Sequence, residues 1–169
     1  MRSHISSRIL LAFTLISLLG TTGCLNRGPT PAARQTALNY ANKLGRTEAN
    51  TLAIYDFCHS GGCWANVTFV TQATHDDFET LAFTKGFGRS GYGTSGEYLL
   101  QDLESYTHKK PVKIGPNPTV GQKDWTVVSY WTRSNPDVSV KLYDATLWPD
   151  FYEYDGKLMK DRVVVVLAQ

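Results

Sequence analysis

Three stretches near the C-terminal end carry the strongest structural signal of this chain: DWTVVSYWT (124–132), VKLYDATLW (140–148) and FYEYDGKLMKDRVVV (151–165). They are rich in aromatic and β-branched residues, which favour β-strands. Asp155-Gly156 is a strong signal for a two-residue hairpin turn. The run VVVVL (163–167) is typical of a strand that is buried on both faces. The C-terminal half is therefore predicted to form antiparallel strands.

The N-terminal half carries helix signals instead. Thr30-Pro31 is a typical helix start, and the apolar residues that follow at helical spacing end at Gly45. Thr47 predicts the start of a short second helix. The expected elements are helices over 31–44, 47–55 and 96–107 and strands over 64–70, 112–114, 125–132, 139–147, 151–154 and 157–167, whereas residues 71–93 fit a helical turn or a loop. Helices followed by a run of strands indicate an α+β fold.

This order of elements and the three C-terminal stretches resemble the NTF2-like superfamily, which includes SnoaL-like proteins, ketosteroid isomerases and scytalone dehydratase. The resemblance covers roughly residues 31–167 and is most specific where an aromatic residue precedes Asp155-Gly156-Lys157 and a final apolar strand follows. It implies a single domain over 31–169, in which the helices pack on a curved antiparallel sheet and form a cone with an apolar pocket. The Gly- and Cys-rich segment 58–93 and Trp148-Pro149-Asp150 depart from the family pattern.

Catalytic members of that family carry an acid on the pocket face, and Asp144 is the candidate here. Strand alternation places Asp144 on the same face as Val140 and Leu142, where desolvation would raise its pKa, as suits a general base. We expect a ligand pocket lined by Val140, Leu142 and Tyr106. Tyr40 of the first helix is a second catalytic candidate, because it lies near the position where ketosteroid isomerases place an oxyanion-donating Tyr.

Structural interpretations compete with these roles. Asp144 can lie at a strand end, solvated or paired with a nearby Arg, and Tyr40 can simply be a core aromatic. The strand around Val67–Val70 carries no acid that matches the isomerases' base, which weakens an isomerase assignment. The glycines between 86 and 93 do not form a phosphate-binding motif, and we predict neither a cofactor nor a metal.

Residues 1–23 have the features of a bacterial lipoprotein signal peptide. Arg2 and Arg8 precede or border the apolar run ILLAFTLISLL (9–19). This run is shorter than the roughly 20 residues that span a bilayer, and it fits the apolar region of an export signal. Gly23-Cys24 then resembles a lipobox, the site where a signal peptidase cuts before a Cys that becomes lipidated.

The expected address is therefore the cell envelope. Lipidated Cys24 would anchor the chain, with a tether over 24–30, and Leu25 does not match the Asp of an inner-membrane retention signal. We expect an outer-membrane location facing the periplasm. Thr21 stands where an aliphatic residue is usual, and the alternative is an ordinary secretory signal that leaves Cys24 as a free thiol.

Export bears on the two other cysteines, which lie in CHSGGC (58–63). An oxidising compartment permits a disulfide, and Gly61-Gly62 can turn tightly enough to bring Cys58 and Cys63 together. Free thiols and a metal site that also uses His59 are the alternatives.

Charge excludes some partners. The formal net charge of +2 matches Arg2 and Arg8 of the signal, so the rest of the chain is neutral. A neutral domain has no electrostatic footprint for nucleic acid or for anionic lipid headgroups. The favoured function is a non-catalytic NTF2-like lipoprotein domain that binds a small apolar ligand or a partner, such as an envelope protein or a second copy. The alternatives are a lyase, isomerase or hydrolase that uses Asp144, and an accessory lipoprotein of a secretion or conjugation apparatus.

Overall fold

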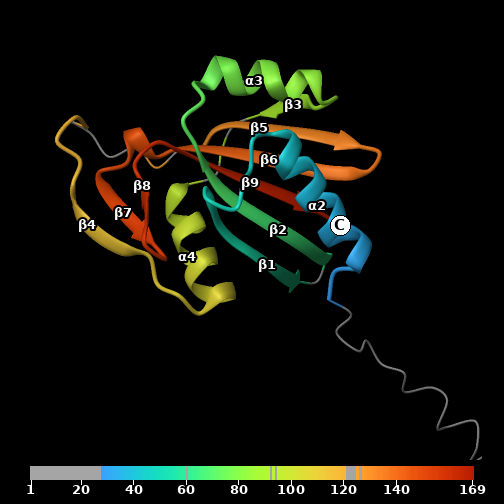
Figure 1. The fold of residues 1–169 in the computed structure, drawn as a ribbon, viewed down its shortest axis with the longest axis horizontal. Coiled ribbons are helices and arrows are strands. Elements are labelled where there is room, and N and C mark those ends of the chain that lie inside the picture. Colours follow the sequence, from blue (N-terminus) through green and yellow to red (C-terminus); the bar gives the residue numbers. More distant parts are fainter. Residues whose placement is uncertain (1–27, 60, 92, 94, 121–124, 126) are drawn as a thin grey trace, which may run out of the picture.

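The computed structural model describes residues 28–59, 61–91, 93, 95–120, 125 and 127–169. Its strands are β1 (Thr51–His59), β2 (Gly62–Thr71), β3 (Gly88–Gly91), β4 (Val112–Pro116), β5 (Val127–Ser134), β6 (Asp137–Asp144), β7 (Asp150–Tyr154), β8 (Lys157–Met159) and β9 (Arg162–Ala168). Six of them form an antiparallel sheet in the order β1-β2-β9-β6-β5-β3 (Figure 1). The other three form a small sheet, β4-β7-β8, beside one end of the large one.

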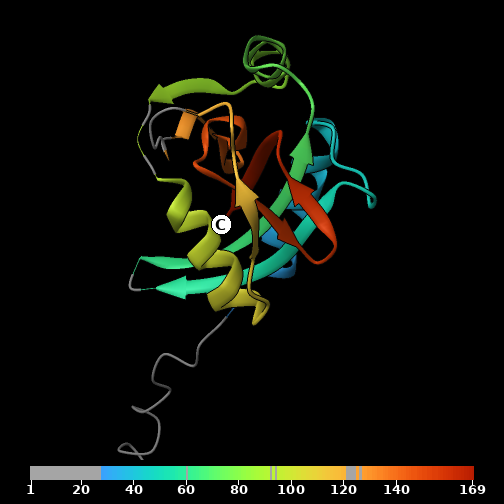
Figure 2. The same ribbon diagram turned by 90° about the vertical axis from the view of Figure 1, so that its left-hand side faces the viewer.

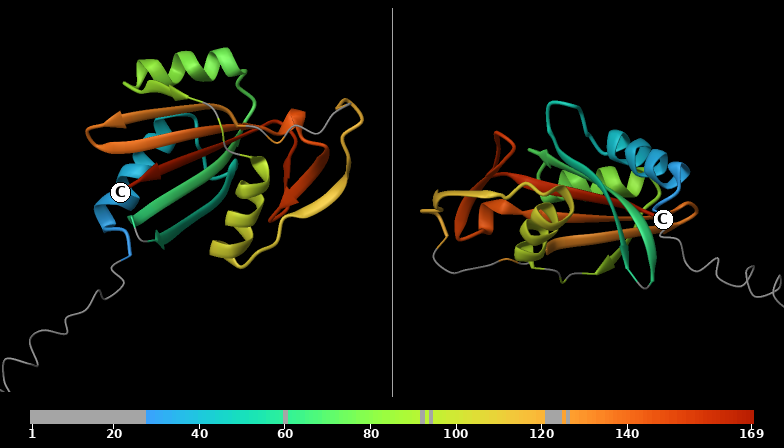
Figure 3. Two further views of the ribbon diagram at one scale, coloured as in Figure 1. Left: turned by 180° about the vertical axis from the view of Figure 1, so that it is seen from behind. Right: turned by 90° about the horizontal axis from the view of Figure 1, so that it is seen from below.

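Three helices pack against the large sheet: α2 (Pro31–Lys43), α3 (His75–Thr84) and α4 (Gly96–Thr107). As the sequence predicted, Thr30 caps α2, and its hydroxyl oxygen accepts a hydrogen bond from the Ala33 amide at 3.1 Å. α2 and α3 lie on one face of the sheet, whereas α4 and the small sheet lie on the other (Figures 2 and 3). Antiparallel strands with separate helices confirm the α+β class.

The sheet is buried on both faces, and β9 shows this directly. Val164 and Val166 belong to the core under α2 and α3, which we call the α2-side core. Val163 and Val165 belong to the core under α4 and the small sheet, the α4-side core. Because successive side chains of a strand point to opposite faces, an unbroken valine run can serve both cores. The prediction of a doubly buried strand is confirmed.

The predicted second helix over 47–55 is wrong, because most of these residues form β1 instead. Thr47 does not cap a helix: its hydroxyl and the Asn50 side chain each accept a hydrogen bond from the other residue's amide, which closes a tight turn. The following sequence TLAIYDF (51–57) is rich in β-branched and aromatic residues. It pairs along its length with β2, so strand pairing overrides a weak helical pattern.

The C-terminal strands also differ in their ends. The predicted strand 157–167 is two strands: β8 pairs with β7 in the small sheet, and β9 pairs with β2 and β6 in the large one. The strand predicted over 139–147 ends at Asp144, and a single 3-10 turn, η1 (Ala145–Leu147), follows. The segment 71–93, for which the sequence fitted a helical turn or a loop, contains α3 and β3.

The predicted signal peptide (1–23), Cys24 and the tether up to residue 27 lie outside the described residues. Within the part that the structure describes, no helix is both long and apolar enough to cross a membrane.

Candidate functional site

The residues that the sequence proposed for one pocket lie on two faces of the sheet. Tyr40, Val140 and Leu142 are buried in the α2-side core. The Tyr40 ring packs edge-on against Phe87, with ring centroids 5.5 Å apart. Tyr106 lies on the opposite face, where it stacks on Tyr55 of the α4-side core. These side chains therefore do not converge.

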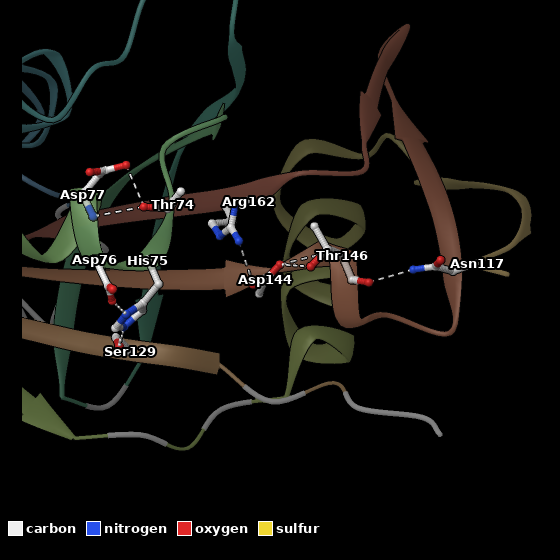
Figure 4. Close-up of polar contacts among 9 residues, drawn as sticks. All are labelled: Thr74, His75, Asp76, Asp77, Asn117, Ser129, Asp144, Thr146 and Arg162. Atoms are coloured by element: carbon white, nitrogen blue, oxygen red, sulfur yellow. Dashed lines mark hydrogen bonds and ion pairs between the residues drawn. The ribbon is translucent and has the colours of Figure 1, made fainter. Parts of the chain in front are cut away.

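Asp144 lies at the end of β6 and is held by neighbours (Figure 4). Its carboxylate lies 3.4 Å from the Arg162 guanidinium, and it accepts hydrogen bonds from the Thr146 amide at 3.1 Å and the Thr146 hydroxyl at 2.5 Å. Asp144 thus caps η1 and pairs with an Arg, as the structural interpretation of this residue proposed. A carboxylate with these partners is engaged in structure.

Figure 4 also shows a Ser-His-Asp arrangement at the start of α3. The His75 Nε2 atom lies 2.5 Å from the Ser129 hydroxyl, and His75 Nδ1 lies 3.1 Å from the Asp76 carboxylate. The order resembles a catalytic triad, which is recognised by geometry. However, Ser129 is 0% exposed, whereas the Asp76 side chain is 96% exposed. A substrate cannot reach the buried Ser129 hydroxyl. We therefore interpret the contact between His75 and Ser129 as a structural one that joins α3 to β5.

Titratable and aromatic side chains gather in a pocket between α4 and the sheet. It has a volume of about 210 Å³ and we call it the α4 pocket. Its lining consists of Tyr55, Phe57, His59, Asn66, Leu99, Asp102, Lys141, Tyr143, Val165 and Leu167. Four strands and one helix supply these residues, so the pocket depends on the folded domain.

Residue periodicity explains this convergence. Tyr55, Phe57 and His59 alternate along β1, so they share one face, and Lys141 and Tyr143 do the same on β6. Leu99 and Asp102 are three residues apart on α4 and therefore neighbours on the helix surface. The strand order β1-β2-β9-β6 places Tyr55, Phe57 and His59 on one side of the pocket, and Lys141 and Tyr143 on the other.

A buried hydrogen-bond chain holds Tyr55 in place on the β1 side of the pocket. The Thr68 hydroxyl donates to the Asn66 side-chain oxygen at 2.8 Å, and the Asn66 amide nitrogen donates to the Tyr55 hydroxyl at 2.9 Å. Burial is the main cause that raises the pKa of Tyr55, and the negative charge of Asp102 is the second cause. The Tyr55 phenol therefore stays protonated at neutral pH and remains available for hydrogen bonding.

Two opposite charges face the pocket from different elements. Burial lowers the pKa of Lys141 and raises that of Asp102, and each charge partly offsets the effect of burial on the other. No ion pair joins them, and none of the described residues hydrogen-bonds the Lys141 ammonium or the Asp102 carboxylate. The fold thus holds Lys141, a half-buried residue on β6, and Asp102, a solvent-accessible residue on α4, at the same pocket.

Aromatic rings build the β1 side of the pocket and continue to its rim. Phe57 stacks on Trp64, with ring centroids 5.5 Å apart, and contacts Tyr106 of α4 at 5.3 Å. His59 stacks on Trp64 at 4.3 Å. These contacts give the pocket one wall of flat, polarisable surface.

A disulfide closes the hairpin that carries this wall. Cys58 and Cys63 are bonded, and they face each other across β1 and β2 with Cα atoms 4.1 Å apart. The predicted pairing is confirmed. The disulfide joins two strands at the end of a hairpin, because the residues before Cys58 form β1 and not the predicted helix over 47–55.

The α4 pocket was not predicted, although part of its signal is present in the sequence. The alternation of β6 separates Lys141 and Tyr143 from Val140 and Leu142. The predicted pocket used the apolar face of the strand, with Val140 and Leu142, and not the face of Lys141 and Tyr143. Asp102 was not singled out, because its direction depends on which side of the sheet α4 covers.

Two other possibilities are weaker. A hollow of about 330 Å³ lined by Asn50, Val70, Thr71, Gln72 and Asp161 has one charged side chain and lies wide open. Among the residues described by the structure, no group of three or more His, Cys, Asp and Glu side chains could hold a metal ion.

No family model, no curated protein and no solved structure matches this chain, so the chemistry of the α4 pocket itself must carry the functional assignment.

Proposed function

We propose that this chain is a ligand-binding domain of the cell envelope that takes one small molecule of mixed polarity into the α4 pocket. The observation that carries this proposal is Lys141, a half-buried residue in the pocket wall whose ammonium has no hydrogen-bonding partner among the described residues. Removing a charge from water costs free energy unless a partner compensates. A bound ligand would supply that partner.

The dimensions of the pocket limit the ligand. A volume of 210 Å³ corresponds to about seven water molecules at liquid density. It is below the range of about 300–1,000 Å³ that is usual for drug-sized ligands. Apolar floor residues Val165 and Leu167, together with the phenols of Tyr55 and Tyr143, favour a ligand that has both apolar and hydrogen-bonding parts.

The residues of the pocket favour binding over catalysis. Asp144 was the acid on which the enzyme hypothesis rested, and it is paired with Arg162 outside the pocket lining. The NTF2-like cone is part of this proposal, because a pocket between a helix and an antiparallel sheet is the kind of site that the resemblance implies. α2 covers the face of the sheet opposite to that pocket.

We place the domain at the envelope on two grounds. The sequence of residues 1–24 has the features of a lipoprotein signal ending in Cys24. The Cys58–Cys63 disulfide supports an oxidising compartment, where such bonds persist. A lipid on Cys24 would anchor the domain to a membrane, with outer-membrane attachment facing the periplasm as the proposed site.

The binding proposal is tested with a fragment library and ligand-observed NMR on wild-type protein and two variants. Asp102→Trp places a large side chain at the pocket, and Gln101→Trp places it one position along α4, outside the pocket lining. Both positions are exposed, so both variants should fold, which circular dichroism checks.

We expect fragments that bind wild-type and Gln101→Trp protein but not Asp102→Trp protein. The proposal would be overturned if the library yields no binder, or if its binders also bind the Asp102→Trp protein.

A further inference from the structure

The charges of the α4 pocket are balanced but separated. Lys141 supplies one positive charge from β6 and Asp102 one negative charge from α4, with no ion pair between them. A ligand with a single charge would match one of these groups and leave the other without a partner. A small zwitterion would match both.

The geometry gives such a ligand a direction. β1 and β6 are separated in the sheet by β2 and β9, which corresponds to about 14 Å between the outer strands at usual spacing. The carboxylate would face Lys141 on the β6 side. The remainder of the molecule would extend over Val165 and Leu167 towards Tyr55 and Phe57 on the β1 side.

The β1 side favours an apolar or flat group. Phe57 is stacked on Trp64 and touches Tyr106, so the rings are already packed before a ligand binds. Aromatic pairs prefer offset or edge-on contacts, which stabilise them beyond the burial of their surface area. An aromatic side chain would extend this cluster by one ring.

We infer that the α4 pocket binds a free α-amino acid with an aromatic or large apolar side chain, its carboxylate at Lys141, its ammonium at Asp102 and its side chain against the β1 rings. This inference rests on the proposed function and names the ligand class for that site. The volume of the pocket accommodates one amino acid and not a folded or extended peptide.

The ionisation of the pocket supports the same arrangement. Burial lowers the pKa of Lys141 and raises the pKa of Asp102. A zwitterion would bring an opposite charge to each group, so binding should shift the pKa of Lys141 upward and that of Asp102 downward. A ligand of one charge would shift only one of them in this way.

The test is isothermal titration calorimetry with phenylalanine and three probes, each lacking one of its parts. The probe 3-phenylpropanoate lacks the ammonium, phenethylamine lacks the carboxylate and glycine lacks the ring. We expect phenylalanine to bind at least tenfold more tightly than each of the three.

Variants assign each charge to its partner. In Lys141→Met protein, phenylalanine should lose its advantage over phenethylamine, whereas in Asp102→Asn protein it should lose its advantage over 3-phenylpropanoate. Lys160→Met is the matched control, because Lys160 is exposed and outside the pocket lining. It should bind all probes as the wild-type protein does.

The outcomes separate this inference from the proposed function. If phenethylamine or 3-phenylpropanoate binds as tightly as phenylalanine, the zwitterion inference is overturned and the pocket remains a binding site. The same holds if no probe binds while library fragments still bind and Asp102→Trp blocks them. If fragments fail as well, both proposals fall.

Discussion

The Arg162 guanidinium lies 3.4 Å from the Asp144 carboxylate where the two neighbouring strands β6 and β9 are in register. The side chain of Arg162 is only 21% exposed and that of Asp144 only 11%. Asp144 also accepts two hydrogen bonds from Thr146, so one carboxylate holds both the adjacent strand and the turn that follows β6. The pair therefore stabilises the point where the chain leaves the large sheet for the small one.

Asp144→Ala should destabilise the protein by about 3 kcal/mol, because it leaves a largely buried guanidinium without its carboxylate and removes a cap. Urea unfolding followed by tryptophan fluorescence measures the loss. Asp137→Ala, at the exposed start of the same strand, is the control and should change stability by less than about 0.5 kcal/mol. Equal stabilities of the two variants would show that the ion pair contributes nothing.

Lys141→Met should stabilise the domain at neutral pH when no ligand is added. Burial depresses the folded-state pKa of Lys141 below its usual 10.5, so the charged amine costs stability at pH 7. That cost is released as the pH rises through the lowered pKa towards 10.5. The gain in melting temperature should therefore shrink in alkaline buffer, whereas Lys160→Met should show no such trend. A gain that is independent of pH would contradict this explanation.

The same Lys141→Met variant should raise the pKa of Asp102 further above its usual 3.8, because Lys141 is the charge that lowers it against the effect of burial. The side-chain carboxyl signal in an NMR pH titration measures this change. The pKa of Asp102 should stay at its wild-type value in Lys160→Met protein. An unchanged value in Lys141→Met protein would mean that the two charges do not sense each other.

Removing the disulfide with Cys58→Ser/Cys63→Ser should cost about 2 kcal/mol, the value expected when a short loop is no longer closed. Wild-type protein in reductant should match the double variant in urea unfolding. Because Phe57 and His59 lie on the same hairpin, fragments should also bind the α4 pocket more weakly. A stable variant with unaltered fragment binding would show that the strand pairing alone fixes the wall.

Ser129 should not react with a fluorophosphonate probe that labels nucleophilic serines, because its hydroxyl is fully buried against His75. Ser129→Ala should instead lower stability by about 1 kcal/mol through the lost hydrogen bond. Mass spectrometry of the treated protein detects labelling, with a known serine hydrolase as the positive control. Stoichiometric labelling would reopen the hydrolase alternative.

Membrane-extracted protein should begin at Cys24 and carry lipid. Intact mass spectrometry should give the mass of residues 24–169 plus acyl chains, and Cys24→Ser should abolish the lipid and the membrane association. A soluble chain that is cut at another position would contradict the lipoprotein proposal.

The strands were predictable where one pattern sufficed. The valine run of β9 and the alternation of β6 depend on local side-chain type, and both appear as expected. β1 was mispredicted because its partner is β2, and a helical pattern in Ala49, Leu52 and Ala53 does not show that pairing. Local sequence indicates periodicity, whereas pairing decides which period the chain adopts.

The candidate site was less predictable than the fold for a similar reason. Asp144 shares a face with Val140 and Leu142 by alternation, but its Arg162 partner is set by the register between β6 and β9. Lys141 and Asp102 come together because α4 covers the face opposite to α2. The local sequences of β6 and α4 do not specify which face of the sheet α4 will cover.

The roof and the floor of the α4 pocket differ in how firmly they are held. The floor belongs to β9, which is hydrogen-bonded on both sides and buried on both faces. The roof is α4, where only Gly96, Leu99 and Leu103 are buried. Elements with few buried contacts open locally at lower free energy than core strands. Amide hydrogens of α4 should therefore exchange much faster than those of β9, so the helix side of the pocket is the side whose local stability a bound ligand would raise most.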